Sequence, residues 1–208
     1  MKAHYLDPDE LERTLAEVRA SPADGGRLEA IVARPATDER RRLEVAHLSP
    51  EGGLEGDRWA SAGEPADQQV SLMNARLLRQ LAGGDRARMA EAGDNLIVDL
   101  DLSDENLPSG TRLRVGGVLL EVTGATHTGC GKFASRFGPD AARFVNAARR
   151  RSLHLRGRYA RVLEPGTVCV GDPIHKEPPL PTAQHPLPRV SFKSVGRRTR
   201  GMSERNRR

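Results

Sequence analysis

Short apolar runs, each ended by a turn rich in glycine, proline or aspartate, recur along most of this chain and restrict the folds open to it. The clearest pair is residues 111–115 and 118–123, which flank Gly116-Gly117. Two strand-like runs joined by two glycines predict a tight antiparallel hairpin. That hairpin leads the chain directly towards His127 and Cys130.

A second hairpin is predicted from residues 157–163 and 168–174, which the turn-forming residues 164–166 separate. Further strands are expected at residues 28–34, 43–48, 69–73 and 96–100, and helices at residues 8–22, 75–81, 85–92 and 139–149. Strands therefore outnumber helices. We predict a mainly β fold, a closed or partly closed β-barrel with a few peripheral α-helices, since closure leaves no unpaired strand edge.

The net charge of +5 is unevenly distributed along the 208 residues. Residues 178–208 carry eight basic side chains and one acidic side chain, so this segment contributes +7 and the remainder −2. We expect a helix and turn over residues 1–26, one barrel domain over residues 27–176, and a basic, extended or disordered tail over residues 177–208. The tail could contact nucleic acid nonspecifically through its charges.

Apolar segments of membrane-spanning length are absent from the sequence, and the amino terminus lacks the apolar core of a signal peptide. We therefore expect a cytoplasmic protein with no membrane partner. Both cysteines, Cys130 and Cys169, are expected to remain thiols in that reducing compartment. Cys169 alternates with two valines in a predicted strand, which predicts inert packing in the core.

The segment around Cys130 is the strongest candidate for a functional site. Glycines flank the cysteine, His127 precedes it and Lys132 follows it. Only the thiolate form of cysteine is a nucleophile or a metal ligand, and the charge of Lys132 or of a protonated His127 would favour that form. The same residues are equally compatible with a small buried side chain in a tight turn. The local sequence leaves both interpretations open.

Two other regions carry charged residues that could bind a ligand. Asp57 and Arg58 lie in a glycine-rich loop, where they either present a ligand-binding pair or close a turn beside Trp59. Seven arginines and no acidic residue occur from Arg143 to Arg161. Such a run is typical of a solvated face, and the alternative is an electropositive wall for an anionic ligand such as a phosphate.

Seven short motifs, taken in order, resemble the MOSC domain, which is named for the carboxy-terminal part of molybdenum cofactor sulfurases. The resemblance covers about residues 27–176. Its motifs are Gly56-Asp57-Arg58, Gln69-Val70-Ser71-Leu72, Gly93-Asp94-Asn95-Leu96, Leu107-Pro108-Ser109-Gly110, Cys130, Arg156-Gly157-Arg158-Tyr159-Ala160-Arg161-Val162 and Gly171-Asp172-Pro173-Ile174. Each motif is weak alone, but their common order is specific.

The resemblance implies a distorted β-barrel that in some members binds the molybdenum-pterin cofactor. One cysteine then serves as molybdenum ligand or as carrier of sulfane sulfur, and by position that cysteine is Cys130. Thiolates are suitable ligands for such metal centres and can also accept a persulfide. His127 and Lys132 are then candidate catalytic side chains that tune the thiolate.

The cofactor carries a terminal phosphate, so Arg58, Arg156 and Arg158 become candidate contacts to an anionic group. Asp57 and Asn95 match family motifs and are further candidates for cofactor binding. Both side chains could equally stabilise their own loops through hydrogen bonds to the backbone.

The implied function is cofactor sulfuration or molybdenum-dependent reduction of N-hydroxylated compounds, with a sulfur-donor or redox protein as partner. The wider family also implies pyridoxal phosphate binding, although the sequence shows no pyridoxal-phosphate desulfurase domain. Gly129 stands where many relatives have proline or another residue, and Asp94 where glutamate is common. These departures predict a pocket that differs from that of most relatives.

Two other functions fit the same residues. Cys130 and His127 could act as nucleophile and base of a cysteine hydrolase, although the sequence shows no third orienting residue. A noncatalytic barrel could instead bind a small anion while its basic tail contacts nucleic acid.

Overall fold

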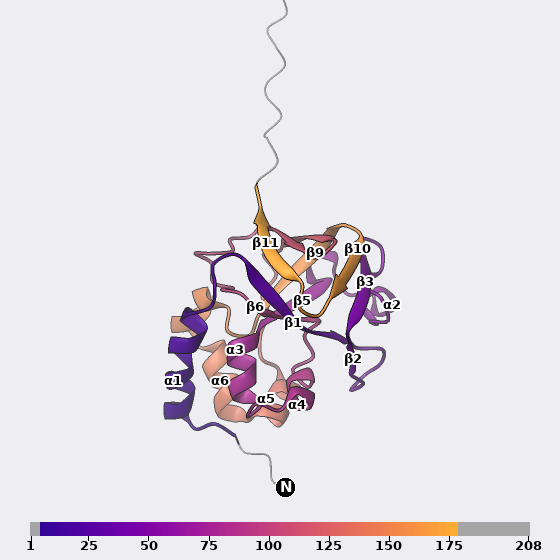
Figure 1. Cartoon of the computed structure of the whole chain (residues 1–208). Helices are drawn as coiled ribbons and strands as arrows, with labels where there is room; N and C mark the ends of the chain where they lie inside the picture. Colours follow the sequence, from indigo (N-terminus) through magenta and orange to yellow (C-terminus); the bar gives the residue numbers. More distant parts are fainter. Residues whose placement is uncertain (1–4, 179–208) are drawn as a thin grey trace, which may run out of the picture.

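The computed structural model describes residues 5–178, whose strands form a barrel with helices gathered below it in Figure 1. The helices are α1 (Pro8–Arg19), α2 (Trp59–Ala62), α3 (Ala75–Leu81), α4 (Arg86–Ala90), α5 (Gly131–Phe137) and α6 (Pro139–Asn146), with the 3-10 helices η1 (Ala66–Gln68) and η2 (Ala148–Leu153). The strands are β1 (Gly26–Ala33), β2 (Arg41–Leu43), β3 (Val45–Ser49), β4 (Gly53–Leu54), β5 (Val70–Asn74), β6 (Leu96–Asp99), β7 (Arg112–Val115), β8 (Val118–Val122), β9 (Arg158–Glu164), β10 (Gly166–Cys169) and β11 (Pro173–Glu177). The predicted barrel with peripheral helices is confirmed.

Strand pairing closes the larger sheet into a ring. Its order is β11-β7-β8-β9-β5-β6-β1, and β1 pairs back onto β11 through Gly26 and Ile174, which gives seven barrel strands among the described residues. Strand β2 extends this sheet outward from β1. Strands β5 and β6 run parallel, and the other neighbours in the ring are antiparallel. Ring closure satisfies strand edges that would otherwise be unpaired.

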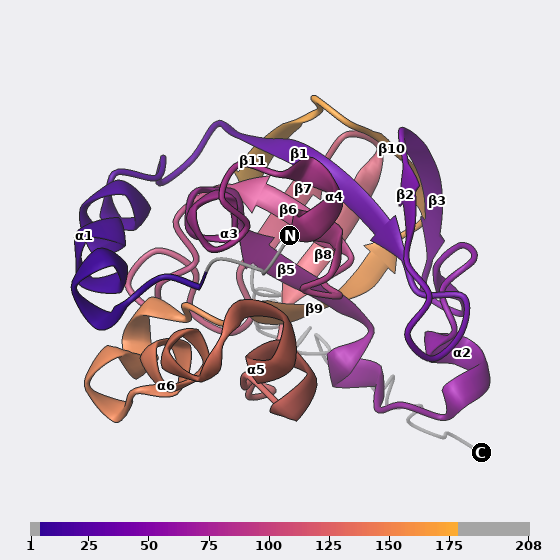
Figure 2. The ribbon, with the colours of Figure 1, turned by 90° about the horizontal axis from the view of Figure 1, so that it is seen from below.

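Apolar side chains form two separate cores. One fills the barrel and includes Leu28 and Leu120. The other lies between the barrel and the helices and includes Leu11 of α1, Leu78 of α3 and Phe133 of α5. Figure 2 shows α1, α3, α5 and α6 grouped together beside the strands. Burial of one large apolar side chain stabilises a fold by roughly 1.5–3 kcal/mol. Phe133 therefore anchors α5 to the rest of the helical core.

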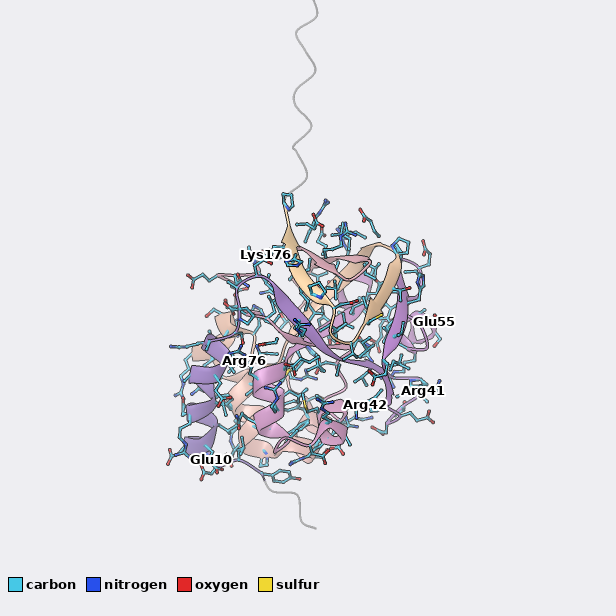
Figure 3. The ribbon with its side chains drawn as sticks, viewed as in Figure 1. Glu10, Arg41, Arg42, Glu55, Arg76 and Lys176 are labelled. Atoms are coloured by element: carbon cyan, nitrogen blue, oxygen red, sulfur yellow. The ribbon has the colours of Figure 1, made fainter. Side chains whose placement is uncertain are left out.

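Arg76 of α3 ties the helical layer to the barrel (Figure 3). Its Nε donates to Oδ1 of Asp99 in β6 at 2.6 Å, and its Nη1 donates to the carbonyl of Ala20, which follows α1, at 2.8 Å. One guanidinium thus joins three elements that are distant in sequence.

The two predicted hairpins have different outcomes. The hairpin at Gly116-Gly117 is confirmed, because β7 and β8 pair with Val115 opposite Val118. The second hairpin is wrong: β9 pairs with β8 and β5, whereas β10 pairs with β3 in a separate three-stranded sheet. A turn sequence specifies that the chain reverses, but the burial of apolar faces chooses the partner strand.

Three other local predictions need correction. Predicted strand 43–48 is divided between β2 of the barrel sheet and β3 of the small sheet. Helix α5 was not predicted, and it begins directly after Cys130. Cys169 is half-buried, not core, because Val168 is the residue of β10 that points inward.

The predicted tail of residues 177–208 lies outside the described residues except for its first two positions. Within residues 5–178, no helix is long and apolar enough to cross a membrane.

Candidate functional site

Cys130 is the N-terminal cap residue of α5, and its side chain is exposed. Partial burial of the sulfur raises the thiol pKa. The backbone N–H groups of Phe133 and Lys132 and the guanidinium of Arg156 lower it more strongly, so the pKa of Cys130 lies below that of an ordinary cysteine. An exposed cysteine with a stabilised thiolate can attack an electrophile, accept sulfur or bind a metal.

Asn146, the last residue of α6, fixes the backbone immediately before Cys130. Its Oδ1 accepts the N–H of Gly129 at 2.8 Å, and its Nδ2 donates to the Gly129 carbonyl at 2.9 Å. A Cβ atom on residue 129 would lie 3.1 Å from Cγ2 of Val145 and 3.3 Å from Nδ2 of Asn146. Glycine at this position is therefore explained by the close approach of α6 to the backbone just before Cys130, which we call the cysteine loop.

A buried ion pair between Arg156 and Asp94 supports α5. Nη1 of Arg156 donates to the two Asp94 carboxylate oxygens at 2.9 and 2.7 Å, and Nη2 donates to the carbonyl of Ala92 at 3.2 Å. The guanidinium carbon lies 4.9 Å from the centre of the Phe133 ring. Because Phe133 belongs to the first turn of α5, this contact places a positive charge near the Cys130 thiol.

His127 is mostly buried beside the same carboxylate, with its Nδ1 inaccessible to solvent. Its Nδ1 lies 3.6 Å from Oδ1 of Asp94, and its ring centre lies 4.4 Å from that of Tyr159. Burial, reinforced by the charges of Arg156 and Arg34 and opposed by that of Asp94, lowers the pKa of His127 to about 4. The side chain is therefore neutral at neutral pH. Among the described residues it forms no hydrogen bond with Cys130.

The ammonium group of Lys132 pairs with Asp38. Nζ of Lys132 donates to Oδ1 of Asp38 at 2.8 Å, and Nη2 of Arg136, one turn later in α5, reaches the same oxygen at 2.9 Å. The contribution of Lys132 to the Cys130 thiolate comes through its backbone N–H. The sequence correctly placed Lys132 beside the cysteine but could not give the direction of its side chain.

Further cations surround Asp38, and we call Arg40, Arg58, Lys132 and Arg136 the Asp38 cluster. Burial and the charges of Arg136, Arg34 and Arg58 lower the pKa of Arg40, whose Nε has no hydrogen-bond partner among the described residues. Nη1 of Arg58 donates to Oγ1 of Thr37 at 3.2 Å. Cationic groups therefore outnumber carboxylates at this surface.

Asp57 and Asn95 form a buried network around Arg34. Nε and Nη2 of Arg34 donate to the two Asp57 oxygens at 2.8 and 3.0 Å, and Nη2 also donates to Oδ1 of Asn95 at 3.1 Å. Asn95 donates from Nδ2 to Asp57 at 2.9 Å and accepts from Ser71. The Asp57 side chain is 1% exposed, so it cannot reach a ligand at the surface. Both side chains instead bind Arg34 and help to fix the neighbouring strand ends.

Arg158 begins β9 and lies in a cleft lined also by His127, Arg151 and Arg156. Its Nη1 donates to Oδ1 of Asp104 at 2.8 Å, and Nε2 of His154 lies 2.7 Å from that oxygen. Six of the seven arginines between positions 143 and 161 have carboxylate partners, and Arg151 has none within the described part of the chain. The run is therefore mostly neutralised and does not form one continuous basic wall.

The structure brings Arg156 and His127 together at Asp94, with the Arg156 charge acting on the Cys130 thiol. The network of Arg34, Asp57 and Asn95 adjoins this group, because Arg34 also acts on His127 and Asp94. Sequence reasoning missed Asn146 as a support of the cysteine loop, because nothing in its local sequence links it to Gly129. Asp94 was visible in the sequence only as a departure from the family pattern. Its role emerges from the contacts with Arg156 and His127.

No group of three or more histidine, cysteine, aspartate or glutamate side chains that could hold a metal is present in the described part of the chain. A metal bound at Cys130 would therefore take its other ligands from a cofactor or a partner.

The MOSC domain family model matches residues 47–175. Among solved structures, the chain is similar to the YUAD protein from Bacillus subtilis, with 19% identity, a TM-score of 0.51, and coverage of 74% of this chain and 97% of that chain. It is also similar to YiiM from Geobacillus stearothermophilus, with 15% identity, a TM-score of 0.51, and coverage of 74% and 75%. At these identities the likeness shows the fold alone, and no curated protein matches. The family match spans more than half of the chain, and the protein therefore belongs to the MOSC domain family of sulfur-binding domains related to the molybdenum cofactor.

Proposed function

We propose that this protein carries sulfane sulfur on Cys130 in cofactor sulfuration. The observation that supports this most directly is an exposed thiol whose pKa is lowered at the start of a fixed helix. Cys130 is exposed, so its sulfur is open to a donor protein. Both cysteines are free thiols, which fits the predicted cytoplasmic location.

In the proposed step the Cys130 thiolate attacks the outer sulfur of a donor persulfide. A bond forms between the Cys130 sulfur and that sulfur, while the sulfur–sulfur bond of the donor breaks and the donor leaves as a thiolate. No net oxidation occurs, because the sulfane sulfur only changes its carrier. The N–H groups at the start of α5 and the charge of Arg156 stabilise the attacking thiolate.

A second candidate function is ligation of the molybdenum-pterin cofactor by Cys130. The Asp38 cluster supports it, since Arg58, Lys132 and Arg136 carry charged donors suited to an anionic group, and Nε of Arg40 is buried with no hydrogen-bond partner among the described residues. The residues thus fit a cofactor that needs one protein thiolate and cationic contacts. When bound, the cofactor would supply a redox-active metal for the reduction of N-hydroxylated compounds.

Two alternatives have less support. A cysteine hydrolase needs a base in hydrogen-bond reach of the nucleophile, and His127 instead faces Asp94 and Tyr159. Asp94 lies 3.6 Å from Nδ1 of His127, beyond hydrogen-bond distance, and within residues 5–178 the ring forms no hydrogen bond with Cys130. The nucleic-acid-binding tail lies outside the described residues and stays a prediction.

The decisive experiment compares Cys130→Ser with Cys169→Ser. Each full-length protein is treated with glutathione persulfide, and mass spectrometry measures the addition of one sulfur atom. We expect loading of the wild type and of Cys169→Ser but none of Cys130→Ser. Wild-type loading of Cys130→Ser would contradict the proposal.

The same proteins, purified from a host that produces the cofactor, are analysed for molybdenum. Metal that is retained by Cys169→Ser and lost from Cys130→Ser would favour the second candidate function.

A further inference from the structure

A positively charged surface adjoins the Cys130 thiol on one side of α5. The thiol accepts the backbone N–H of Lys132, so this residue lies directly beside the sulfur. Arg136 follows one turn later in α5, and residues at that spacing share a helix face. Both side chains reach Oδ1 of Asp38, in the connection between β1 and β2, at 2.8 and 2.9 Å. The start of α5 therefore presents its sulfur next to the Asp38 cluster.

Cations outnumber carboxylates on this surface. The single carboxylate of Asp38 is shared by two cations, and that of Glu64 lies 4.0 Å from Nη2 of Arg58. Three consecutive arginines at positions 40–42, two of them labelled in Figure 3, form no ion pair with any described residue. The cations are Arg40, Arg41, Arg42, Arg58, Lys132 and Arg136, and the carboxylates are Asp38, Glu39 and Glu64.

The side of Cys130 that faces α6 carries no such excess of charge. There the uncharged Asn146 holds the backbone of Gly129. The two charged residues of α6, Asp140 and Arg143, pair with each other. The unbalanced charge therefore lies on one side of the thiol, where it can orient a partner as well as attract it.

We propose that the Asp38 cluster, together with Arg41 and Arg42, is the docking surface for a sulfur-donor protein that carries acidic side chains around its persulfide. The proposal rests on the sulfur-carrier function proposed above. In the transfer, the outer sulfur of the donor persulfide becomes bonded to the Cys130 sulfur, and the donor leaves as a thiolate. Because the persulfide must touch the Cys130 sulfur, the donor segment that flanks it lies against Lys132.

Exposed charges of this kind act mainly on the encounter between two proteins. The Lys132 side chain is 53% exposed, and exposed ion pairs contribute little to affinity. Complementary charge instead steers association and fixes orientation, and salt weakens this effect by screening. The expected complex is therefore transient, and the rate of sulfur transfer is the quantity to measure.

Three synthetic peptides with a central cysteine persulfide serve as donors. Their flanking residues are glutamates in the first, glutamines in the second and lysines in the third. Mass spectrometry follows the addition of one sulfur atom to full-length Cys169→Ser, in which Cys130 is the single cysteine. Each rate is divided by the rate of transfer from the same peptide to 2-mercaptoethanol, a neutral thiol, because flanking charges also change the reactivity of the persulfide itself.

We expect the normalised rate of the glutamate peptide to exceed that of the glutamine peptide by about tenfold at low ionic strength, with the lysine peptide slowest. The difference should shrink as salt is added. Combining Arg58→Gln with Lys132→Gln in the same background should lower the glutamate-to-glutamine ratio by about threefold. This ratio compares two donors on one protein, so any change in the reactivity of Cys130 cancels. Arg143→Gln is the matched control and should keep the ratio, because Arg143 is an exposed arginine outside the cluster.

Equal normalised rates for the glutamate and glutamine peptides, with Cys130 loaded by both, would overturn the docking surface and leave the sulfur-carrier function intact. That result is expected if the cluster serves only an anionic group of the cofactor. An equal fall of the ratio in the combined variant and in Arg143→Gln would assign the preference to the net charge of the protein and would also overturn the docking surface. Absence of loading by all three peptides would contradict the sulfur-carrier function, and this proposal with it.

Discussion

The two cysteines of this chain have the same side chain but opposite surroundings. Cys130 is exposed at the start of α5, where backbone N–H groups and Arg156 favour its thiolate. Cys169 is half-buried in β10, where its backbone pairs with Val45 and its N–H donates to Oδ2 of Asp172 at 2.7 Å. The chemistry of a thiol here is set by the element that carries it and not by the residues next to it in sequence.

The largest expected effect is a difference in alkylation. At pH 7, iodoacetamide should modify Cys130 faster than Cys169 by about tenfold, because the thiolate is the reactive form. Peptide mass spectrometry over a time course measures both rates in one sample. The Cys130 rate should level off at a lower pH than that of free cysteine, since its pKa is lowered. Equal alkylation rates at Cys130 and Cys169 would contradict the difference in thiolate stability between them.

Asp94→Asn should weaken the support of α5, the helix that Cys130 caps. The substitution leaves the Arg156 guanidinium buried without its carboxylate partner, and we expect a loss of about 3 kcal/mol in the free energy of unfolding, measured in urea. Asp140→Asn is the control, because the exposed pair of Asp140 and Arg143 should contribute less than about 0.5 kcal/mol. A loss no larger than that of the control would show that the pair does not support α5.

His127 should make stability depend on pH in a defined range. Its folded pKa of about 4 lies below the ordinary value of 6.5, so between these values the unfolded chain binds more protons than the folded chain. Stability is therefore lost as the pH falls through this range, by about 2 kcal/mol at pH 5.

His127→Gln should remove this part of the pH dependence, which urea unfolding at pH 7 and pH 5 can measure. If the wild type and His127→Gln lose the same free energy of unfolding between pH 7 and pH 5, the pH dependence comes from groups other than His127.

Asn146→Ala should have the smallest effect. It removes two hydrogen bonds to the Gly129 backbone and is expected to lower the free energy of unfolding by about 1 kcal/mol. Because these bonds fix the entry to α5, alkylation of Cys130 should also slow towards the Cys169 rate. Asn106→Ala, which removes an amide bonded to the carbonyl of Asp101, should leave that rate unchanged.

Local sequence was sufficient for features set by neighbouring residues. The Gly116-Gly117 turn joins β7 and β8 as predicted, and Asn74 caps α3 by accepting the N–H of Leu77 at 3.0 Å. The hairpin prediction succeeds because turn geometry depends on contacts within a few residues, and helix capping is equally local.

The missed features depend on residues far apart in the chain. The sequence correctly showed that Asp57 and Asn95 lie in polar loops, but Arg34 buries both of them. It also showed no sign that Asn146, 17 residues beyond Gly129, holds the cysteine loop. In each case a contact with a distant element fixes the side chain, and the neighbouring residues in sequence do not determine that contact.

The sequence by itself predicted a closed or partly closed β-barrel, recorded the order of the family motifs and singled out Cys130 as the candidate thiol. These follow from the spacing of apolar runs, turns and motifs, which a one-dimensional pattern records. Only the tertiary structure decided the surroundings of that cysteine, the burial of the His127 ring nitrogen and the ion pair between Arg156 and Asp94. Burial and electrostatics depend on which segments pack together, and packing is settled by the fold as a whole.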